Sequence, residues 1–159
     1  MRYIIYQMII YVLGGKKKTR EDQAIFRTRY TPQVLTAVSY DADGKELARS
    51  SLAPAYGKLS LCLTPEKSDS EIVYIPVEIT GENGVVESNA DRKLTVTVEG
   101  GELLAFGSAN PCHEEQYHTG SFTTYYGRAL AVVRAEGCCS VSVSDGKETA
   151  TVRLTLGQE

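Results

Sequence analysis

The sequence predicts an all-β fold. Short runs rich in β-branched residues are separated by turn-forming residues at intervals of roughly 8–12 residues, and no segment of ten or more residues has a helical pattern. This pattern favours antiparallel β-sandwiches of the immunoglobulin type over a parallel α/β sheet. With 159 residues, 42% of them hydrophobic and 23% charged, the chain can bury a core without metal or disulfide support.

The expected strands outnumber those of a single seven-stranded sandwich. In chain order they span residues 3–13, 23–30, 34–40, 46–51, 58–64, 72–80, 94–99, 102–106, 129–135, 138–144 and 149–156. Glycine-containing turns support three connections, at Asp41–Gly44, Asn83–Gly84 and Asp145–Gly146, because glycine readily adopts the positive φ that tight hairpins need.

A domain joint is expected at Ala53–Gly57, where proline and glycine interrupt the alternation. The sequence therefore predicts two immunoglobulin-like sandwich modules in tandem, residues 1–56 and 57–159. The first holds only four expected strands and is incomplete at its N-terminus. In the second, residues 107–127 form a loop longer than most connections in compact domains, so we expect it to be functional or packed against another part of a protein.

The N-terminal strand 3–13 is apolar but far shorter than the roughly 20 residues of a membrane-spanning helix, and it lacks a signal-peptide cleavage site. No membrane association is expected. An exposed strand this apolar would instead promote self-association.

Charge, cysteines and motifs exclude several function classes. The net charge of −3 argues against a general polyanion binder, and the basic run Lys16–Arg20 is typical of a solvated turn, so no nucleic-acid partner is expected. The four cysteines lack C-x-x-C spacing and are expected to be reduced, which favours the cytoplasm, although a pair involving Cys62 remains open. Cys112, His113 and His118 offer too few ligands at an untypical spacing for zinc. No dinucleotide, Walker or hydrolase motif is present, so no cofactor is expected.

Residues 58–156 resemble the C-terminal immunoglobulin-like module of family 2 glycoside hydrolases, the β-galactosidase-like enzymes. The segments that carry this resemblance are Phe106–Pro111, Glu114–Tyr117 and Tyr125–Arg134, preceded by Val77–Val86, Asn89–Asp91 and Val98–Leu104. Upstream, Gly14–Lys18, Phe26–Tyr30, Leu35–Tyr40 and Gly44–Arg49 resemble the small β-domain that precedes this module in the family.

The resemblance implies that the chain is the tail of a larger enzyme. In the family, the catalytic carboxylates lie on a β/α barrel before this region, and nothing in this chain matches them. Glu114 and Glu115 are adjacent in the long loop and are not expected to form an acid/base pair, since retaining hydrolysis needs two carboxyl groups about 5–5.5 Å apart across a sugar. We therefore expect no catalysis by the chain itself.

Six residues around the long loop are the candidate contact residues. Tyr117, Tyr125 and Tyr126 could stack on a sugar ring, with Asn110, Glu115 and Arg128 as polar partners. The favoured interpretation is that the same aromatic residues pin the loop to the sandwich or to a neighbouring domain, because buried aromatic residues contribute mainly packing area. The leading prediction is an accessory module whose partners are the catalytic and other domains of a parent hydrolase; the alternatives are a free-standing carbohydrate-binding or adhesive module, and an interaction domain that associates through residues 3–13.

Overall fold

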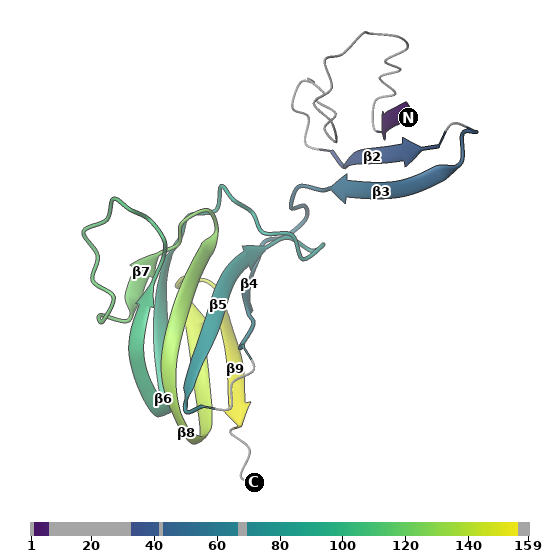
Figure 1. The fold of residues 1–159 in the computed structure, drawn as a ribbon. Helices are drawn as coiled ribbons and strands as arrows, with labels where there is room; N and C mark the ends of the chain where they lie inside the picture. Colours follow the sequence, from purple (N-terminus) through teal and green to yellow (C-terminus); the bar gives the residue numbers. More distant parts are fainter. Residues whose placement is uncertain (1, 7–32, 42, 67–69, 156–159) are drawn as a thin grey trace. The chain divides into compact units, whose positions relative to one another are not determined.

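The computed structural model describes residues 2–6, 33–41, 43–66 and 70–155. In these residues every regular element is a β-strand (Figure 1), which confirms the all-β prediction. The chain divides into two compact units, Met1–Pro54 and Ala55–Glu159. The part of the chain that the structure describes contains no helix long and apolar enough to cross a membrane.

The first unit contains an antiparallel three-stranded sheet in the order β1-β2-β3. Its strands are β1 (Arg2–Tyr6), β2 (Leu35–Tyr40) and β3 (Glu46–Leu52). Val38 of β2 is buried, whereas every residue of β3 is exposed. The expected strand 23–30 and residues 7–13 of the expected strand 3–13 lie outside the described residues. An incomplete sandwich in this unit, and self-association through 3–13, therefore stay predictions.

The second unit contains six strands. They are β4 (Ser60–Leu63), β5 (Ile72–Thr80), β6 (Lys93–Gly107), β7 (Ser121–Thr123), β8 (Arg128–Ser144) and β9 (Thr149–Thr155). They pair in the order β4-β5-β8-β6-β7, with β9 added to β8, and every pairing is antiparallel.

Two long strands, β6 and β8, run through both layers of a sandwich. The C-terminal half of β6 pairs with the N-terminal half of β8, which also pairs with β5, whereas the other halves of β6 and β8 pair with β7 and β9. The bend between the halves occurs at Gly100 (φ +75°) and Gly137 (φ +70°), in a conformation that residues with a Cβ atom rarely adopt. A Cβ on Gly100 would also lie 2.4 Å from the carbonyl oxygen of Cys138.

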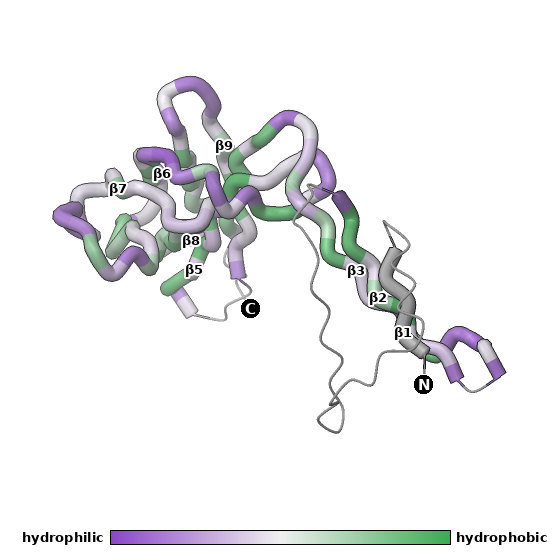
Figure 2. The backbone as a smooth tube through the Cα atoms, turned by 90° about the horizontal axis from the view of Figure 1, so that it is seen from above, coloured by the Kyte–Doolittle hydropathy of each residue, from purple (hydrophilic) through white to green (hydrophobic). Residues whose placement is uncertain are grey.

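The core lies between these layers and follows the alternation of the strands. Val73, Ile75, Val77 and Ile79 of β5 point inward, as do alternate residues of β8. The largest fully buried side chains are Phe106 and Phe122. Hydrophilic residues concentrate at several of the connections between strands (Figure 2).

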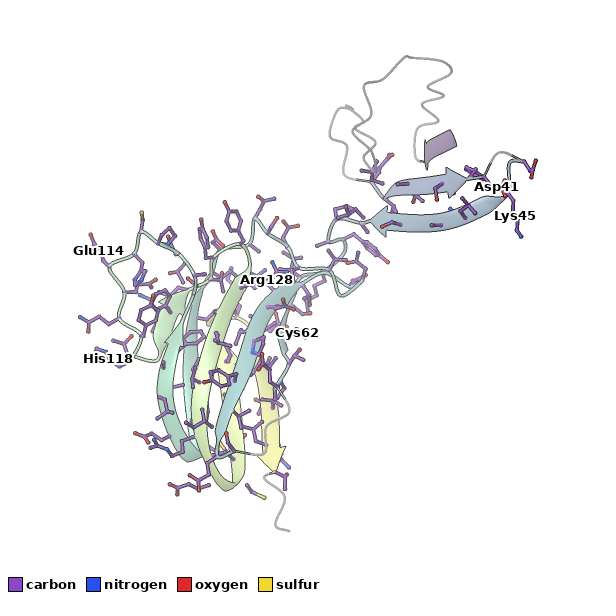
Figure 3. The ribbon with its side chains drawn as sticks, in the orientation of Figure 1. Asp41, Lys45, Cys62, Glu114, His118 and Arg128 are labelled. Atoms are coloured by element: carbon purple, nitrogen blue, oxygen red, sulfur yellow. The ribbon has the colours of Figure 1, made fainter. Side chains whose placement is uncertain are left out.

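The three predicted glycine turns are present. Gly44, Gly84 and Gly146 have φ values of +85°, +72° and +84°. At the tip of the β2–β3 turn (Figure 3), the Asp41 carboxylate accepts hydrogen bonds from the backbone N–H of Asp43 (3.0 Å) and Lys45 (2.8 Å). Such bonds from an aspartate to the residues that follow it stabilise a tight turn.

The structure differs from the sequence prediction in how the strands are divided. The expected strands 94–99 and 102–106 are one continuous strand, β6, and the expected strands 129–135 and 138–144 are likewise β8. Gly100 and Gly137, which lie between the expected strands, are corners across which the pairing resumes with a shifted register. Strand β7 lies inside the loop predicted for residues 107–127 and pairs with only three residues of β6. So short a strand leaves no readable alternation in the sequence.

Candidate functional site

Four of the six predicted contact residues line one hollow of about 620 Å³ beside the paired ends of β6 and β8. These four are Tyr117, Tyr125, Tyr126 and Arg128. The rest of the lining consists of Ala105, Gly107, Ser108, Ala109, Ala129, Leu130 and Val132. Sites for small ligands typically have volumes of about 300–1,000 Å³ and mainly apolar walls.

Tyr117 forms one wall of the hollow and is fixed on several sides. Its ring stacks on Phe122 with a centroid distance of 5.1 Å and an interplanar angle of 11°. Its hydroxyl is hydrogen-bonded to Nε2 of His113 at 2.9 Å. The ring lies over Gly107, where a Cβ atom would come within 2.1 Å of it, so the glycine makes room for the tyrosine. Tyr117 remains 47% exposed, which leaves part of its ring available to a ligand.

A tight turn positions a second aromatic wall. Tyr125 and Arg128 exchange backbone hydrogen bonds of 2.9 and 3.1 Å, and the two residues between them, Tyr126 and Gly127, have φ values of +50° and +71°. Positive φ at both central positions defines a type I′ turn. The Tyr125 and Tyr126 rings are 4.4 Å apart at 57°. A hydrogen bond with the Tyr126 side chain raises the pKa of the Tyr125 hydroxyl.

Arg128 supplies the positive charge at the hollow. Its Nε donates to Oε1 of Glu78 at 3.0 Å, and both side chains are partly exposed. An exposed pair of this kind contributes little to stability, roughly 0–1 kcal/mol. Figure 3 shows Arg128 at the start of β8, at the end of the strand nearest the long loop.

The other two predicted contact residues, Asn110 and Glu115, do not line the hollow and instead hold the β6–β7 loop in shape. The Glu115 carboxylate accepts hydrogen bonds from the backbone N–H (2.9 Å) and the hydroxyl (3.0 Å) of Thr123. The Asn110 side chain accepts one from the backbone N–H of Cys112 at 2.9 Å. These hydrogen bonds within the chain fix the shape of the loop.

The remaining polar residues of this loop do not converge. Glu114 and His118 project outward from it (Figure 3). Both ring nitrogens of His113 have partners within the loop, the Tyr117 hydroxyl and the carbonyl oxygen of Glu115. Among the described residues, no group of three or more histidine, cysteine, aspartate or glutamate side chains could hold a metal ion. The four cysteines are free, with Cys138 exposed and Cys139 buried, as expected for neighbours on opposite faces of a strand.

Comparison with known protein families identifies the sandwich unit. The family described as glycoside hydrolase family 2 C-terminal domain 5 matches residues 64–155, which include the sandwich strands β5 to β9, the long loop and the hollow. The chain belongs to this family. The matched residues thus form a C-terminal domain of the family 2 glycoside hydrolases, which confirms the resemblance predicted from the sequence.

Longer proteins that contain a related region are bacterial glycosidases. The beta-galactosidase BoGH2A of Bacteroides ovatus is 24% identical over 153 residues, covering 89% of this chain and 18% of that protein. A glycosyl hydrolase family 2 member from Bacteroides cellulosilyticus has a similar fold, with a TM-score of 0.80, 23% identity and coverage of 96% of this chain and 22% of that one. A beta-glycosidase from Bacteroides vulgatus gives a TM-score of 0.74, 20% identity, and coverage of 96% and 21%. The chain spans about a fifth of the length of these relatives.

Sequence reasoning did not include Ser108, Leu130 and Val132 among the candidate contact residues. The sequence did mark Leu130 and Val132. They alternate with the buried residues of β8, at positions where a solvated sheet face would carry polar residues. Leu130 and Val132 occupy these outward positions instead. No sequence pattern marks Ser108, whose place depends on the course of the loop.

Proposed function

We propose that this chain is a non-catalytic accessory module of a family 2 glycoside hydrolase and that it supports the catalytic domain by docking against another domain of the parent enzyme. The membership of the domain 5 family supports the accessory role. The named relatives are a beta-galactosidase and a beta-glycosidase, so the proposed parent enzyme cleaves β-glycosidic bonds.

The observation that carries the docking proposal is an apolar outer face on the sheet formed by β5 and β8. We define this outer apolar face as Tyr74, Pro76, Leu130 and Val132. The register places Val132 opposite Tyr74 and Leu130 opposite Pro76, so the four side chains form one continuous surface. Tyr74 is 45% and Leu130 39% exposed. A solvated sheet face would carry polar residues at these positions.

Ion pairs bound this face at both ends. Arg128 pairs with Glu78 at 3.0 Å at one end, and Arg134 pairs with Glu102 at 2.6 Å at the other. An apolar centre within a polar rim is the usual composition of a protein–protein contact surface. Because each rim charge is already balanced within the module, a neutral apolar partner surface fits the face best.

The docking proposal is tested with the parent enzyme. We would mix this chain with the remaining domains of a family 2 glycoside hydrolase and measure their association by analytical ultracentrifugation. Tyr74→Asp should abolish the association, because it places an unpaired charge on the outer apolar face. The matched control is Thr97→Asp, which adds the same charge at an exposed position of β6 in the other layer. Equal association of both variants would contradict the proposed face.

The accessory role is tested with the chain alone. Incubation with nitrophenyl β-glycosides should give no turnover above buffer. Hydrolysis that increases in proportion to the concentration of purified chain would overturn the non-catalytic assignment.

A further inference from the structure

We propose that the hollow between Tyr117 and the Tyr125–Tyr126 turn binds a pyranose sugar ring, with the tyrosine faces as the stacking surfaces. The hollow and both of its walls belong to one compact unit of this chain, and the hollow shares Leu130 and Val132 with the outer apolar face.

Contacts within the chain hold both walls of the hollow in place. Tyr117 is fixed by its stack on Phe122 and by the hydrogen bond to His113, and the Tyr125 and Tyr126 rings hold one another through a ring contact and a hydrogen bond. Fixing rotatable aromatic side chains in advance removes part of the entropic cost of binding. The two walls come from different connections, the β6–β7 loop and the β7–β8 turn, and both line the same hollow.

Tyr126 has a conformation that folding alone does not favour. At φ +50° it occupies a turn position where asparagine or glycine is preferred, yet its side chain is 56% exposed. A residue with a Cβ in the left-handed region costs roughly 1–2 kcal/mol, and strain of this kind concentrates at binding sites. The strained backbone holds an exposed aromatic side chain at the edge of the hollow.

The polar groups of the hollow suit a ligand that has both an apolar face and hydroxyl groups. One face of a β-pyranose carries mainly C–H groups, which are attracted to the electron-rich face of an aromatic ring. The tyrosine hydroxyls and the guanidinium of Arg128 can bond the hydroxyls at the sugar's edge. Ser108 also lines the hollow, and its hydroxyl is buried without a hydrogen-bond partner among the described residues.

The experiment is an NMR titration of the full chain, labelled with ¹⁵N, with methyl β-D-galactopyranoside and methyl β-D-glucopyranoside. We expect saturable shifts of the amides of Gly107, Ser108 and the 125–128 turn. Cyclohexanol, a ring of similar size with a single hydroxyl, should bind at least fivefold more weakly, because it cannot use the polar groups at the rim.

Two variants separate binding from folding. Tyr126→Asn removes the ring, and asparagine tolerates positive φ, so the turn should persist while affinity falls roughly tenfold, as expected for the loss of one stacking surface. Tyr56→Asn is the matched control, since Tyr56 is 61% exposed and does not line the hollow; it should leave the affinity unchanged.

Three results would overturn the proposal. One is an absence of shifts at the hollow with either glycoside at saturating concentration. Another is an affinity for the glycosides that Tyr126→Asn does not change. The third is equal binding of cyclohexanol, which would make the hollow a general apolar surface suited to protein side chains. Docking is tested separately by Tyr74→Asp, because Tyr74 belongs to the outer apolar face and does not line the hollow.

Discussion

Replacing Gly127 by alanine should destabilise the sandwich unit by several kcal/mol, because two separate effects act at this position. The glycine has φ +71°, where a Cβ atom is disfavoured by roughly 1–2 kcal/mol. The added Cβ would also lie 2.4 Å from the backbone carbonyl oxygen of Glu87, which no side-chain rotation can relieve. The Gly127 carbonyl accepts a hydrogen bond from the N–H of Ile79 at 2.9 Å, so displacing the turn would disturb the end of β5 as well.

Gly146→Ala is the matched control, because it shares the first effect and lacks the second. Gly146 has φ +84°, and no atom lies within 4 Å of the Cβ position. Strain at the positive φ costs roughly 1–2 kcal/mol, and the lower entropy of the unfolded alanine variant offsets about 0.4–1 kcal/mol of this. The free energy of unfolding of Gly146→Ala should therefore fall by roughly 1 kcal/mol. For Gly127→Ala, overpacking adds about 1–3 kcal/mol and a weakened hydrogen bond about 1 kcal/mol. The expected difference between the variants is therefore about 2–4 kcal/mol.

The assay is urea unfolding at equilibrium, followed through the amide signals of β8. A residue-specific signal is needed because the chain has two compact units, whose transitions would overlap in a global signal. The midpoint should fall far more for Gly127→Ala than for Gly146→Ala, with the same dependence on urea. If the two variants lost equal stability, the close approach of the turn to Glu87 would make no energetic contribution, and the reasoning would be refuted.

Three further predictions concern single side chains. Burial raises the pKa of the Cys139 thiol, so iodoacetamide should label exposed Cys138 much faster than Cys139, as read by peptide mass spectrometry; equal rates would contradict the inward orientation. Hydrogen bonds from the backbone N–H groups of Glu148 and Lys147 lower the pKa of the Asp145 carboxyl below its ordinary value of 3.8. The ionised carboxylate therefore stabilises the folded state above pH 3.8, and this stabilisation is lost as the pH falls through the lowered pKa. Asp145→Asn should therefore flatten the decline in unfolding free energy from about pH 5 to about pH 2, and an unchanged decline would exclude this group as its source. Glu115→Ala removes both acceptors for Thr123, and amide exchange at Thr123 should accelerate without a comparable change in β5.

The sequence predicts the strands well where one face is buried, and less well at corners and in loops. In β5, the buried Val73, Ile75, Val77 and Ile79 alternate with less buried residues, so periodicity alone identifies the strand. At Gly100, the same local signal fits a strand end and a corner within a strand, because glycine permits both. Only the pairing with β8 on either side distinguishes the two.

The sequence predicted only part of the candidate site, because local sequence does not show which side chains come together in the fold. Tyr117, Tyr125 and Tyr126 are conspicuous because aromatic residues in a long loop need a packing partner or a ligand. Glu115 carries the same polar signal as Arg128, yet its carboxylate is used by Thr123 and only Arg128 reaches the hollow. Which polar residue holds a loop and which faces a ligand depends on contacts distant in sequence, and these are not encoded in local spacing.

Features that add nothing to folding gather at one end of the sandwich. Tyr126 is strained where asparagine would be relaxed, Leu130 is exposed on a sheet face, and the Ser108 hydroxyl is buried without a partner among the described residues. The strain at Tyr126 and the lost solvation of Ser108 lower the stability of the isolated module, and the exposed apolar surface of Leu130 lowers its solubility. A contact that covers Leu130 and Ser108 and uses the Tyr126 ring would offset all three costs together. Binding at this end therefore accounts for features that packing of the core leaves unexplained, and the Tyr126→Asn and Tyr74→Asp variants determine whether sugar, protein or both provide that contact.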